Sequence, residues 1–292
     1  MSIIKLDSAM GTRLIEMGHK LEAPTWSAMV LEDDVEAVEQ VHRENIEAGA
    51  DVITTNTFRT TPFVFHKLMN GVEAHTRARR FTILAIRIAQ KVIKESGRDV
   101  KIAASLTTLG DCYTPSEFPG SIAGRPWHDA QLDNLAHKVV DIILAETINS
   151  SREARLIADL ALKREKPVWM SFVLNDKGQL LNGDNLIDLA KRLEHMGIDA
   201  IGVNCSKPDV TLDAIKRLRD VVKLPLIAYP NLGAADHHDG KMGKVMTPAK
   251  FAQWAGEVIE AGAEIVGGCC GSNYKHITAL SKHLAGNNAV AK

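Results

Sequence analysis

The stretch AIGVNCSKPDVTLDAIKRLRD, residues 200–220, joins a short apolar run to a longer amphipathic segment through a few polar residues. The run 200–205 has the length of a β-strand, and the segment 211–220 has the pattern of a helix. A strand followed by a helix is the unit from which parallel α/β folds are built. The number of times this unit recurs therefore decides the fold class.

Eight apolar runs of this kind occur along the chain. They cover residues 3–9, 50–57, 100–106, 141–147, 167–173, 200–205, 225–230 and 263–269. Nearly continuous apolarity is typical of strands that are buried on both faces of a parallel sheet. Amphipathic segments alternate with them, at 34–48, 72–95, 132–139, 152–163, 185–195, 211–220, 248–260 and 277–283.

Eight strand and helix units predict a (β/α)8 TIM barrel, with an open doubly wound sheet as the competing architecture. No low-complexity linker or change of composition divides the chain, so we expect residues 1–292 to form a single domain. The loops 58–71 and 107–126 follow predicted strands. On a barrel they lie at the carboxyl ends of the strands and are expected to form the walls of a pocket.

Composition narrows the functional classes. The chain has 35 basic and 36 acidic residues, a net charge of -1 and 45% hydrophobic residues. This balance argues against a nucleic-acid or membrane partner. The first residues lack the features of a signal peptide, so we expect a cytoplasmic protein that acts on small molecules. An oligomer is compatible with the sequence.

Three of the four cysteines come together at the ends of two predicted strands. Cys205 ends the sixth strand, and Cys269 and Cys270 end the eighth, so all three thiols should reach the same rim of the barrel. Adjacent residues of a regular strand point to opposite faces. The glycines on both sides of the pair allow the strand to break there, so that both sulfurs can face one site.

Three thiolates suit Zn²⁺ and leave its fourth tetrahedral position open for a substrate. Two alternatives are small buried hydrophobic residues and a vicinal disulfide or redox switch, although the last leaves Cys205 without a role. Cys112 is isolated in a loop and is interpreted as an ordinary thiol.

The chain resembles the homocysteine S-methyltransferase family, which includes betaine- and S-methylmethionine-dependent enzymes and the homocysteine-binding module of methionine synthase. The resemblance extends over nearly the whole chain. It rests on the segments Asp7-Ser8-Ala9-Met10-Gly11-Thr12, Trp26-Ser27-Ala28, Gly49-Ala50-Asp51, Thr54-Thr55-Asn56-Thr57-Phe58, Glu146-Thr147, Ser171-Phe172, Gly202-Val203-Asn204-Cys205-Ser206, Tyr229-Pro230-Asn231 and Gly267-Gly268-Cys269-Cys270-Gly271. The last segment is the most specific.

The resemblance implies one zinc ion held by Cys205, Cys269 and Cys270, with homocysteine as the methyl acceptor. It assigns Asp7 and Glu146 to the amino-acid end of homocysteine. Both carboxylates lie at predicted strand ends, where an α-ammonium group needs acceptors. The backbone around Met10, Gly11 and Thr12 is expected to bind the substrate carboxylate, and Asn204 is grouped with these substrate-binding residues.

The methyl donor is less well defined. Trp26 and Phe58, and also Phe63, are aromatic residues that could hold an onium methyl group by cation–π attraction or could simply pack. The family's first motif commonly has glycine where this chain has Ser8. Its third-strand loop often reads Gly-Pro-Tyr-Gly where residues 107–110 read Thr-Thr-Leu-Gly. The second departure lies near the expected position of the methyl donor. The family resemblance is therefore a weaker guide to which donor this chain uses.

We therefore expect transfer of a methyl group from a small onium donor, such as S-methylmethionine, S-adenosylmethionine or betaine, to the zinc-bound thiolate of homocysteine, giving methionine. Two alternatives stay open at this point. One is a homocysteine-binding acceptor subunit of a corrinoid-dependent methionine synthase system. The other is a non-enzymatic zinc or thiol sensor, in which Asp7 and Glu146 would have no role.

Overall fold

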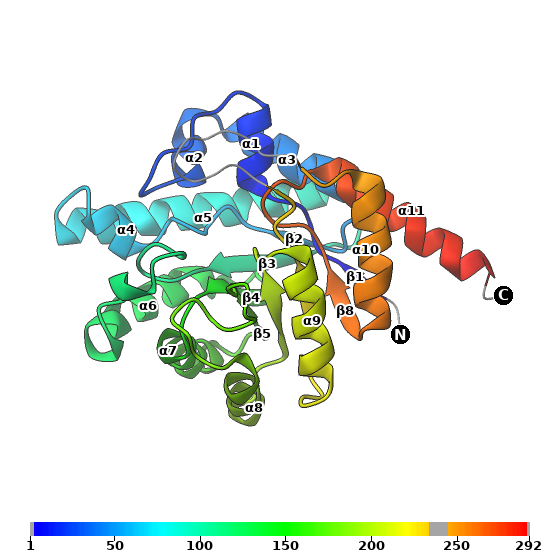
Figure 1. Cartoon of the computed structure of the whole chain (residues 1–292). Coiled ribbons are helices and arrows are strands. Elements are labelled where there is room, and N and C mark those ends of the chain that lie inside the picture. The colour runs from blue at the N-terminus through cyan, green and yellow to red at the C-terminus, as the bar shows by residue number, and fades with distance from the viewer. Residues whose placement is uncertain (1–2, 234–244, 291–292) are drawn as a thin grey trace.

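The computed structural model describes residues 3–233 and 245–290, with side chains up to residue 286. Eight parallel strands form one sheet in the order β1-β8-β7-β6-β5-β4-β3-β2. Their bounds are β1 Ile4–Lys5, β2 Val52–Thr54, β3 Lys101–Leu106, β4 Ile142–Ile148, β5 Val168–Phe172, β6 Ala200–Asn204, β7 Leu226–Tyr229 and β8 Ala263–Val266. Each lies within or overlaps an apolar run of the sequence, which confirms the predicted strands (Figure 1).

The sheet closes into a barrel between β1 and β2. Leu6 and Val52 form an isolated parallel bridge there, and the Asp51 N–H donates to the Lys5 carbonyl at 2.8 Å. The Asp51 carboxylate also accepts from the Lys5 backbone N–H at 2.9 Å and from its Nζ at 2.7 Å. This closure excludes the open doubly wound sheet and confirms the TIM-barrel prediction.

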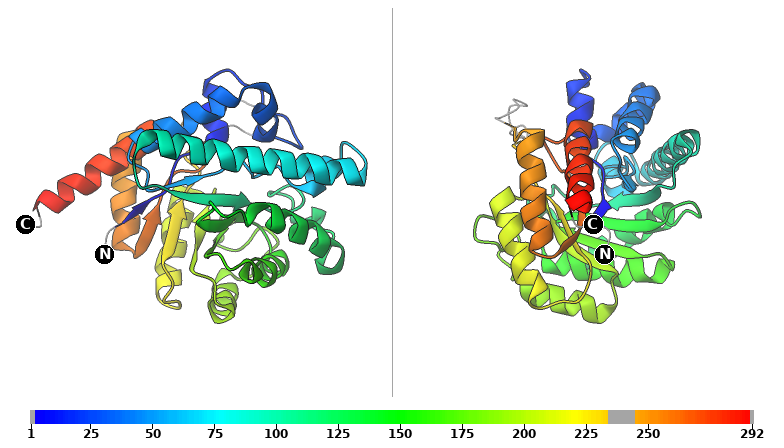
Figure 2. Two further views of the ribbon diagram at one scale, coloured as in Figure 1. Left: turned by 180° about the vertical axis from the view of Figure 1, so that it is seen from behind. Right: turned by 90° about the vertical axis from the view of Figure 1, so that its right-hand side faces the viewer.

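Helices cover the outside of the strands (Figure 2). Their bounds are α1 Met10–Glu16, α2 Val30–Asp33, α3 Val35–Glu47, α4 Pro62–His66, α5 Gly71–Ser96, α6 Ser121–Leu135, α7 Ser151–Ala161, α8 Leu186–Met196, α9 Pro208–Arg219, α10 Pro248–Glu260 and α11 Tyr274–Val290, with short 3-10 turns at Ser27–Met29, Pro115–Glu117 and Leu162–Arg164. None of those in the described part of the chain is both long and apolar enough to cross a membrane.

One helix was predicted in the wrong place. The sequence pattern favoured a helix at 132–139 after a loop that ran to residue 126, whereas α6 occupies Ser121–Leu135. Pro126 lies inside this helix, where the missing N–H removes one backbone hydrogen bond. The short helices α1, α2 and α4 were not predicted either. Helix α4 lies within the segment 58–71 that was interpreted as a loop, and α1 and α2 lie before the first predicted helix.

The strands bury side chains on both faces, as their apolarity requires. In β4, Ile142 and Leu144 belong to the cluster that fills the barrel, together with Trp169 and Tyr229. The alternating residues of the same strand, such as Ile143, pack against the helices. Because the interior is filled, a ligand site has room only where the strands end and the loops begin.

Candidate active site at the carboxyl ends of the strands

A cavity of about 560 Å³ lies at the carboxyl ends of the strands. Its walls include the cysteine cluster, Asp7 and Glu146. The two loops expected to form a pocket contribute as predicted: Phe58, Arg59, Val64 and Lys67 come from the first, and Leu109, Gly110, Asp111, Cys112, Tyr113 and Glu117 from the second. The volume lies within the range of small-molecule sites.

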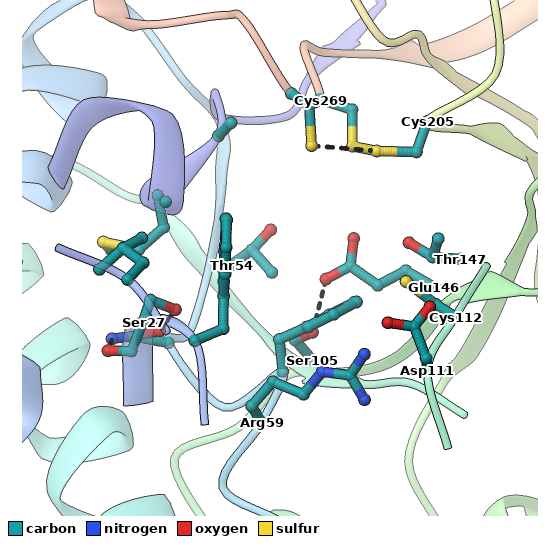
Figure 3. Close-up of a pocket in the computed structure, with 18 of the residues that line it drawn as sticks. Ser27, Thr54, Arg59, Ser105, Asp111, Cys112, Glu146, Thr147, Cys205 and Cys269 are labelled. Atoms are coloured by element: carbon teal, nitrogen blue, oxygen red, sulfur yellow. Dashed lines mark hydrogen bonds between the residues drawn. A yellow bond between two sulfur atoms is a disulfide. The ribbon is translucent and has the colours of Figure 1, made fainter. Parts of the chain in front are cut away.

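The three cysteines meet at one end of this cavity, as the sequence predicted. Their sulfur atoms all lie within 4.8 Å of one another. Cys205 directly follows β6 and adopts the left-handed conformation with a φ of 49°, while its N–H donates to the Tyr229 carbonyl at 3.1 Å. The turn directs the Cys205 side chain toward the pair contributed by the eighth strand (Figure 3).

The strand does break before the cysteine pair. β8 ends at Val266, and the Cys269 N–H donates to the Pro230 carbonyl at 3.1 Å. Gly271 has a φ of 83°, which a residue with a side chain rarely adopts, and its N–H donates to the Thr12 hydroxyl at 2.9 Å. Thr12 therefore fixes the turn that carries the cysteines. Thr12 is not among the residues that line the cavity, and the predicted contact of its backbone with the substrate carboxylate stays a prediction.

In this structure Cys205 and Cys269 are joined by a disulfide, and Cys270 is a free thiol 3.4 Å from the Cys205 sulfur. The disulfide considered from the sequence was the vicinal one, and that pairing is wrong. A disulfide sulfur is not a thiolate ligand, so the three cysteines can bind a metal together only in the reduced protein. Three soft donors this close fit a thiophilic metal ion.

Asp7 is held at the end of β1 by contacts with Thr54. Its carboxylate accepts from the Thr54 backbone N–H at 2.7 Å and from the Thr54 hydroxyl at 2.8 Å. Burial raises the pKa of Asp7 to about 7, against the lowering effect of the two Thr54 bonds, and the nearby Glu146 raises it further. A carboxyl group with this pKa ionises readily when a cation binds beside it.

Glu146 lies near the carboxyl end of β4 and shares the cavity with Asp7. One carboxylate oxygen accepts from the Ser105 hydroxyl, and the other accepts from the Tyr229 hydroxyl at 3.2 Å. Burial raises the pKa of Glu146, although both hydrogen bonds lower it. Asp7 is buried and Glu146 is partly buried, and two neighbouring carboxyl groups that repel each other suit one positively charged group.

Asn204 contacts the protein rather than the cavity. Both polar atoms of its buried side chain bond to Thr147, whose φ is 57°. These bonds hold the residue that follows Glu146. Asn204 is not among the residues that line the cavity, and its place among the substrate-binding residues stays a prediction. Thr147 itself lines the cavity, as do Trp26 and Cys205, which also have positive φ values. Left-handed non-glycine residues often mark functional sites.

The remaining predicted residues divide into two groups. Met10, Gly11, Trp26 and Phe58 line the cavity. Gly11 lies so close to Trp26 that a Cβ atom would be 2.7 Å from the indole nitrogen. Phe63 is absent from the walls and packs edge-on against Trp127 with 5.6 Å between ring centroids.

Sequence reasoning missed several residues of the site. Ser105, at the end of β3, and Tyr229, within a segment that was quoted for the resemblance, orient Glu146. Arg59 and Asp111 lie on the cavity wall within the two loops that were expected to form it. Charged residues in such loops were the available signal, but the pattern alone does not tell whether they point inward.

Comparison with known proteins agrees with this architecture. The sequence pattern described as homocysteine S-methyltransferase matches residues 4–284. Homocysteine S-methyltransferase 1 of Zea mays is 30% identical, with 96% of this chain and 94% of that protein covered. Homocysteine S-methyltransferase 1 of Brassica oleracea var. italica is 28% identical, with 96% and 92% covered.

Solved structures show the same fold. The oxidized form of the homocysteine methyltransferase MmuM from Escherichia coli superimposes with a TM-score of 0.83 at 26% identity, covering 97% of this chain and 96% of that one. The metallated form of the same protein gives the same values. The match of the family pattern to nearly the whole sequence is decisive. The chain belongs to the homocysteine S-methyltransferase family.

Proposed function

We propose that this protein transfers a methyl group from a small onium donor to the thiolate of homocysteine, bound at a zinc ion that Cys205, Cys269 and Cys270 hold, and so forms methionine. The observation that carries the proposal is one cavity with three cysteine sulfurs at one end and the carboxyl groups of Asp7 and Glu146 in its wall. Homocysteine has a thiol at one end and an ammonium group at the other, which matches this arrangement.

The choice of zinc follows from the donor set. Three cysteine sulfurs are soft ligands, and three protein ligands leave one position of a tetrahedral ion for the substrate. The metallated form of MmuM supports the presence of a metal in a structural relative. When bound, zinc supplies the Lewis acidity that keeps the substrate thiol deprotonated near neutral pH.

Asp7 and Glu146 would bind the ammonium group of homocysteine. Asp7 is buried and Glu146 is partly buried, and the binding of a cation favours their ionised forms, which burial otherwise disfavours. Ser105 and Tyr229 hold the Glu146 carboxylate in place, while Thr54 holds Asp7. The substrate is therefore fixed at its ammonium end as well as at its sulfur.

The reaction forms a bond between the homocysteine sulfur and the methyl carbon. The bond between that carbon and the onium sulfur or nitrogen breaks, and its electron pair stays on the leaving atom, which becomes neutral. Opposite charges cancel in this step, so a water-poor cavity favours it. The protein's contribution is to hold the two reactants in line, and no side chain has to act as a general base.

The structure bears on the alternative functions through Asp7 and Glu146. A zinc or thiol sensor needs the cysteines but gives no reason for two mutually repelling carboxyl groups in the same cavity. An acceptor subunit of a corrinoid system would use the same homocysteine site, so the donor must be tested directly.

The test uses the reduced, zinc-loaded protein with homocysteine and a panel of donors: betaine, S-methylmethionine, S-adenosylmethionine and dimethylsulfoniopropionate. We expect methionine to form with at least one of them and the activity to be lost after chelation. Methylcobalamin is tested beside this panel, and methionine formation with it alone would show an acceptor subunit instead. Zinc binding without methylation by any donor would contradict the proposed enzyme.

A further inference from the structure

Arg59 is a buried cation in the wall of the cavity. Its side chain follows β2 and is only 9% exposed. Nη1 donates to the Gly110 carbonyl at 2.8 Å, and the guanidinium carbon lies 5.1 Å from the centroid of the Phe58 ring. Within the described residues, no carboxylate comes within 4.0 Å of its nitrogens. A buried charge without a counter-ion is unfavourable, so this position suits an anionic ligand.

The nearest acidic groups of the wall do not neutralise Arg59 directly. Glu117 bonds to Lys67 at 3.2 Å and to the Asp111 N–H at 3.0 Å, although Arg59 helps to lower the pKa of Glu117. The Asp111 carboxylate accepts from the Tyr113 N–H at 2.6 Å and is exposed. The guanidinium therefore keeps donors free for a ligand that enters the cavity.

Arg59 lies away from the cysteine cluster. Figure 3 shows its guanidinium extending toward Asp111, with Glu146 lying between it and the three sulfurs. A homocysteine whose sulfur lies at the cysteines and whose ammonium lies at Asp7 and Glu146 leaves free the part of the cavity beyond Glu146. The methyl donor then has room in that part, where Arg59 and Phe58 contribute to the wall.

We infer that Arg59 binds a carboxylate of the methyl donor, which makes the donor a zwitterion with an onium centre and a carboxylate tail. This inference rests on the proposed function. A guanidinium and a carboxylate form two parallel charge-assisted hydrogen bonds, which fix the direction of the tail. With the tail fixed at Arg59, the methyl group points toward the cysteine end, where the thiolate lies. The hydrogen bond to the Gly110 carbonyl holds the guanidinium against the loop 107–110, in which residues 107–109 differ from the family's usual sequence.

The experiment compares the parent protein with Arg59→Gln, and uses Arg79→Gln, at an exposed position of α5 outside the cavity, as a matched loss of one positive charge. S-methylmethionine and betaine are each compared with their carboxamides. Arg59→Gln should raise KM for the better carboxylate donor by about ten- to a hundredfold, with KM for homocysteine unchanged. Its KM for the carboxamide should stay close to the parent's value. Arg79→Gln should behave like the parent with every donor.

Two results would overturn the inference: an equal loss with the carboxylate and the carboxamide, or a loss of homocysteine affinity that matches the loss for the donor. The second would place the substrate's own carboxylate at Arg59. Arg59→Lys keeps the charge but lacks the planar guanidinium, and it is the control for misfolding. Its KM for the carboxylate donor should fall between those of the parent and of Arg59→Gln. If the parent forms no methionine, the proposed function fails, and calorimetric binding of both donors to the parent and to Arg59→Gln still decides the inference.

Discussion

The side chain of Asn204 bonds to Thr147 through both of its polar atoms. Oδ1 accepts from the Thr147 backbone N–H at 2.9 Å, and Nδ2 donates to the Thr147 hydroxyl at 2.7 Å. Asn204 ends β6 and immediately precedes Cys205, while Thr147 immediately follows Glu146. The pair thus connects the backbone that carries a proposed metal ligand with the backbone that carries a proposed substrate ligand.

Replacing Asn204 should disturb the substrate side of the site. Asn204→Leu leaves the buried Thr147 N–H without an acceptor, which typically costs about 1–3 kcal/mol of unfolding free energy. We expect that loss in denaturant unfolding and a raised KM for homocysteine, because Glu146 is no longer held in place. A second change, Thr147→Gly, tolerates the positive φ and should restore part of the stability. Loss of stability with an unchanged KM for homocysteine would limit Asn204 to a structural role.

The cysteine assignment predicts which thiols control the metal content. The reduced parent should bind roughly one zinc ion per chain, and Cys269→Ser with Cys270→Ser should bind almost none. Cys112→Ser is the matched control, because Cys112 is also buried and lines the cavity but lies outside the cluster. Elemental analysis gives the answer. Full zinc occupancy in the double variant, or loss of zinc in Cys112→Ser, would show that the ligands were wrongly chosen.

Glu146→Gln should weaken homocysteine binding without releasing the metal. The change keeps the shape of the side chain and removes its charge, and losing a charge-assisted hydrogen bond typically costs about 1.5–3 kcal/mol. The test is a cycle of two proteins and two thiols, homocysteine and 4-mercaptobutanoate, which lacks the ammonium group. The variant should lose affinity for homocysteine and little for 4-mercaptobutanoate. Equal losses for both thiols, or a loss of zinc, would assign Glu146 a structural or metal-binding role.

Asp7 should make the metal-free protein less stable as the pH rises. Its pKa is raised from 3.8 in the unfolded chain to about 7 in the folded one, so the folded state binds the extra proton between these values. Stability therefore falls as the pH rises from about 4 to 7, by at most about 4 kcal/mol. Asp7→Asn removes this dependence and still bonds to Thr54, because a threonine hydroxyl can donate or accept.

The corresponding measurement is the unfolding free energy of the parent and of Asp7→Asn at several pH values. The variant should match the parent near pH 4 and exceed it above pH 7, while binding homocysteine more weakly. The same difference at every pH would mean that ionisation of Asp7 does not control the stability.

The sequence identified the strands because a strand buried on both faces has a nearly continuous apolar run, as in Val168–Phe172. It placed α6 poorly, because Pro126 resembles the end of a loop and the preceding residues show little apolar periodicity. The proposed site residues Cys205, Cys269 and Cys270 were found from their types and their positions at strand ends. The structure brings these three sulfurs together.

Other features depended on side-chain directions that no local pattern contains. The roles of Thr12 and Asn204 as supports, rather than residues of the cavity wall, follow from their contacts with Gly271 and Thr147. The same holds for Arg59, since an arginine in a loop after a strand can extend into solvent or inward. Only the folded structure, in which the Arg59 side chain bonds to the Gly110 carbonyl, shows that this arginine is buried.

The seam between β1 and β2 links the substrate to the integrity of the barrel. Backbone pairing there is short, and side-chain carboxylates extend it, with Asp51 on Lys5 at one end and Asp7 on Thr54 at the other. Asp7 therefore helps to close the barrel and is also a proposed contact of homocysteine. Ligand occupancy should then be visible in amide hydrogen exchange: the Thr54 N–H, bonded to the Asp7 carboxylate, should exchange more slowly when a cation keeps that carboxylate ionised. The barrel is expected to be most tightly closed when its substrate is bound.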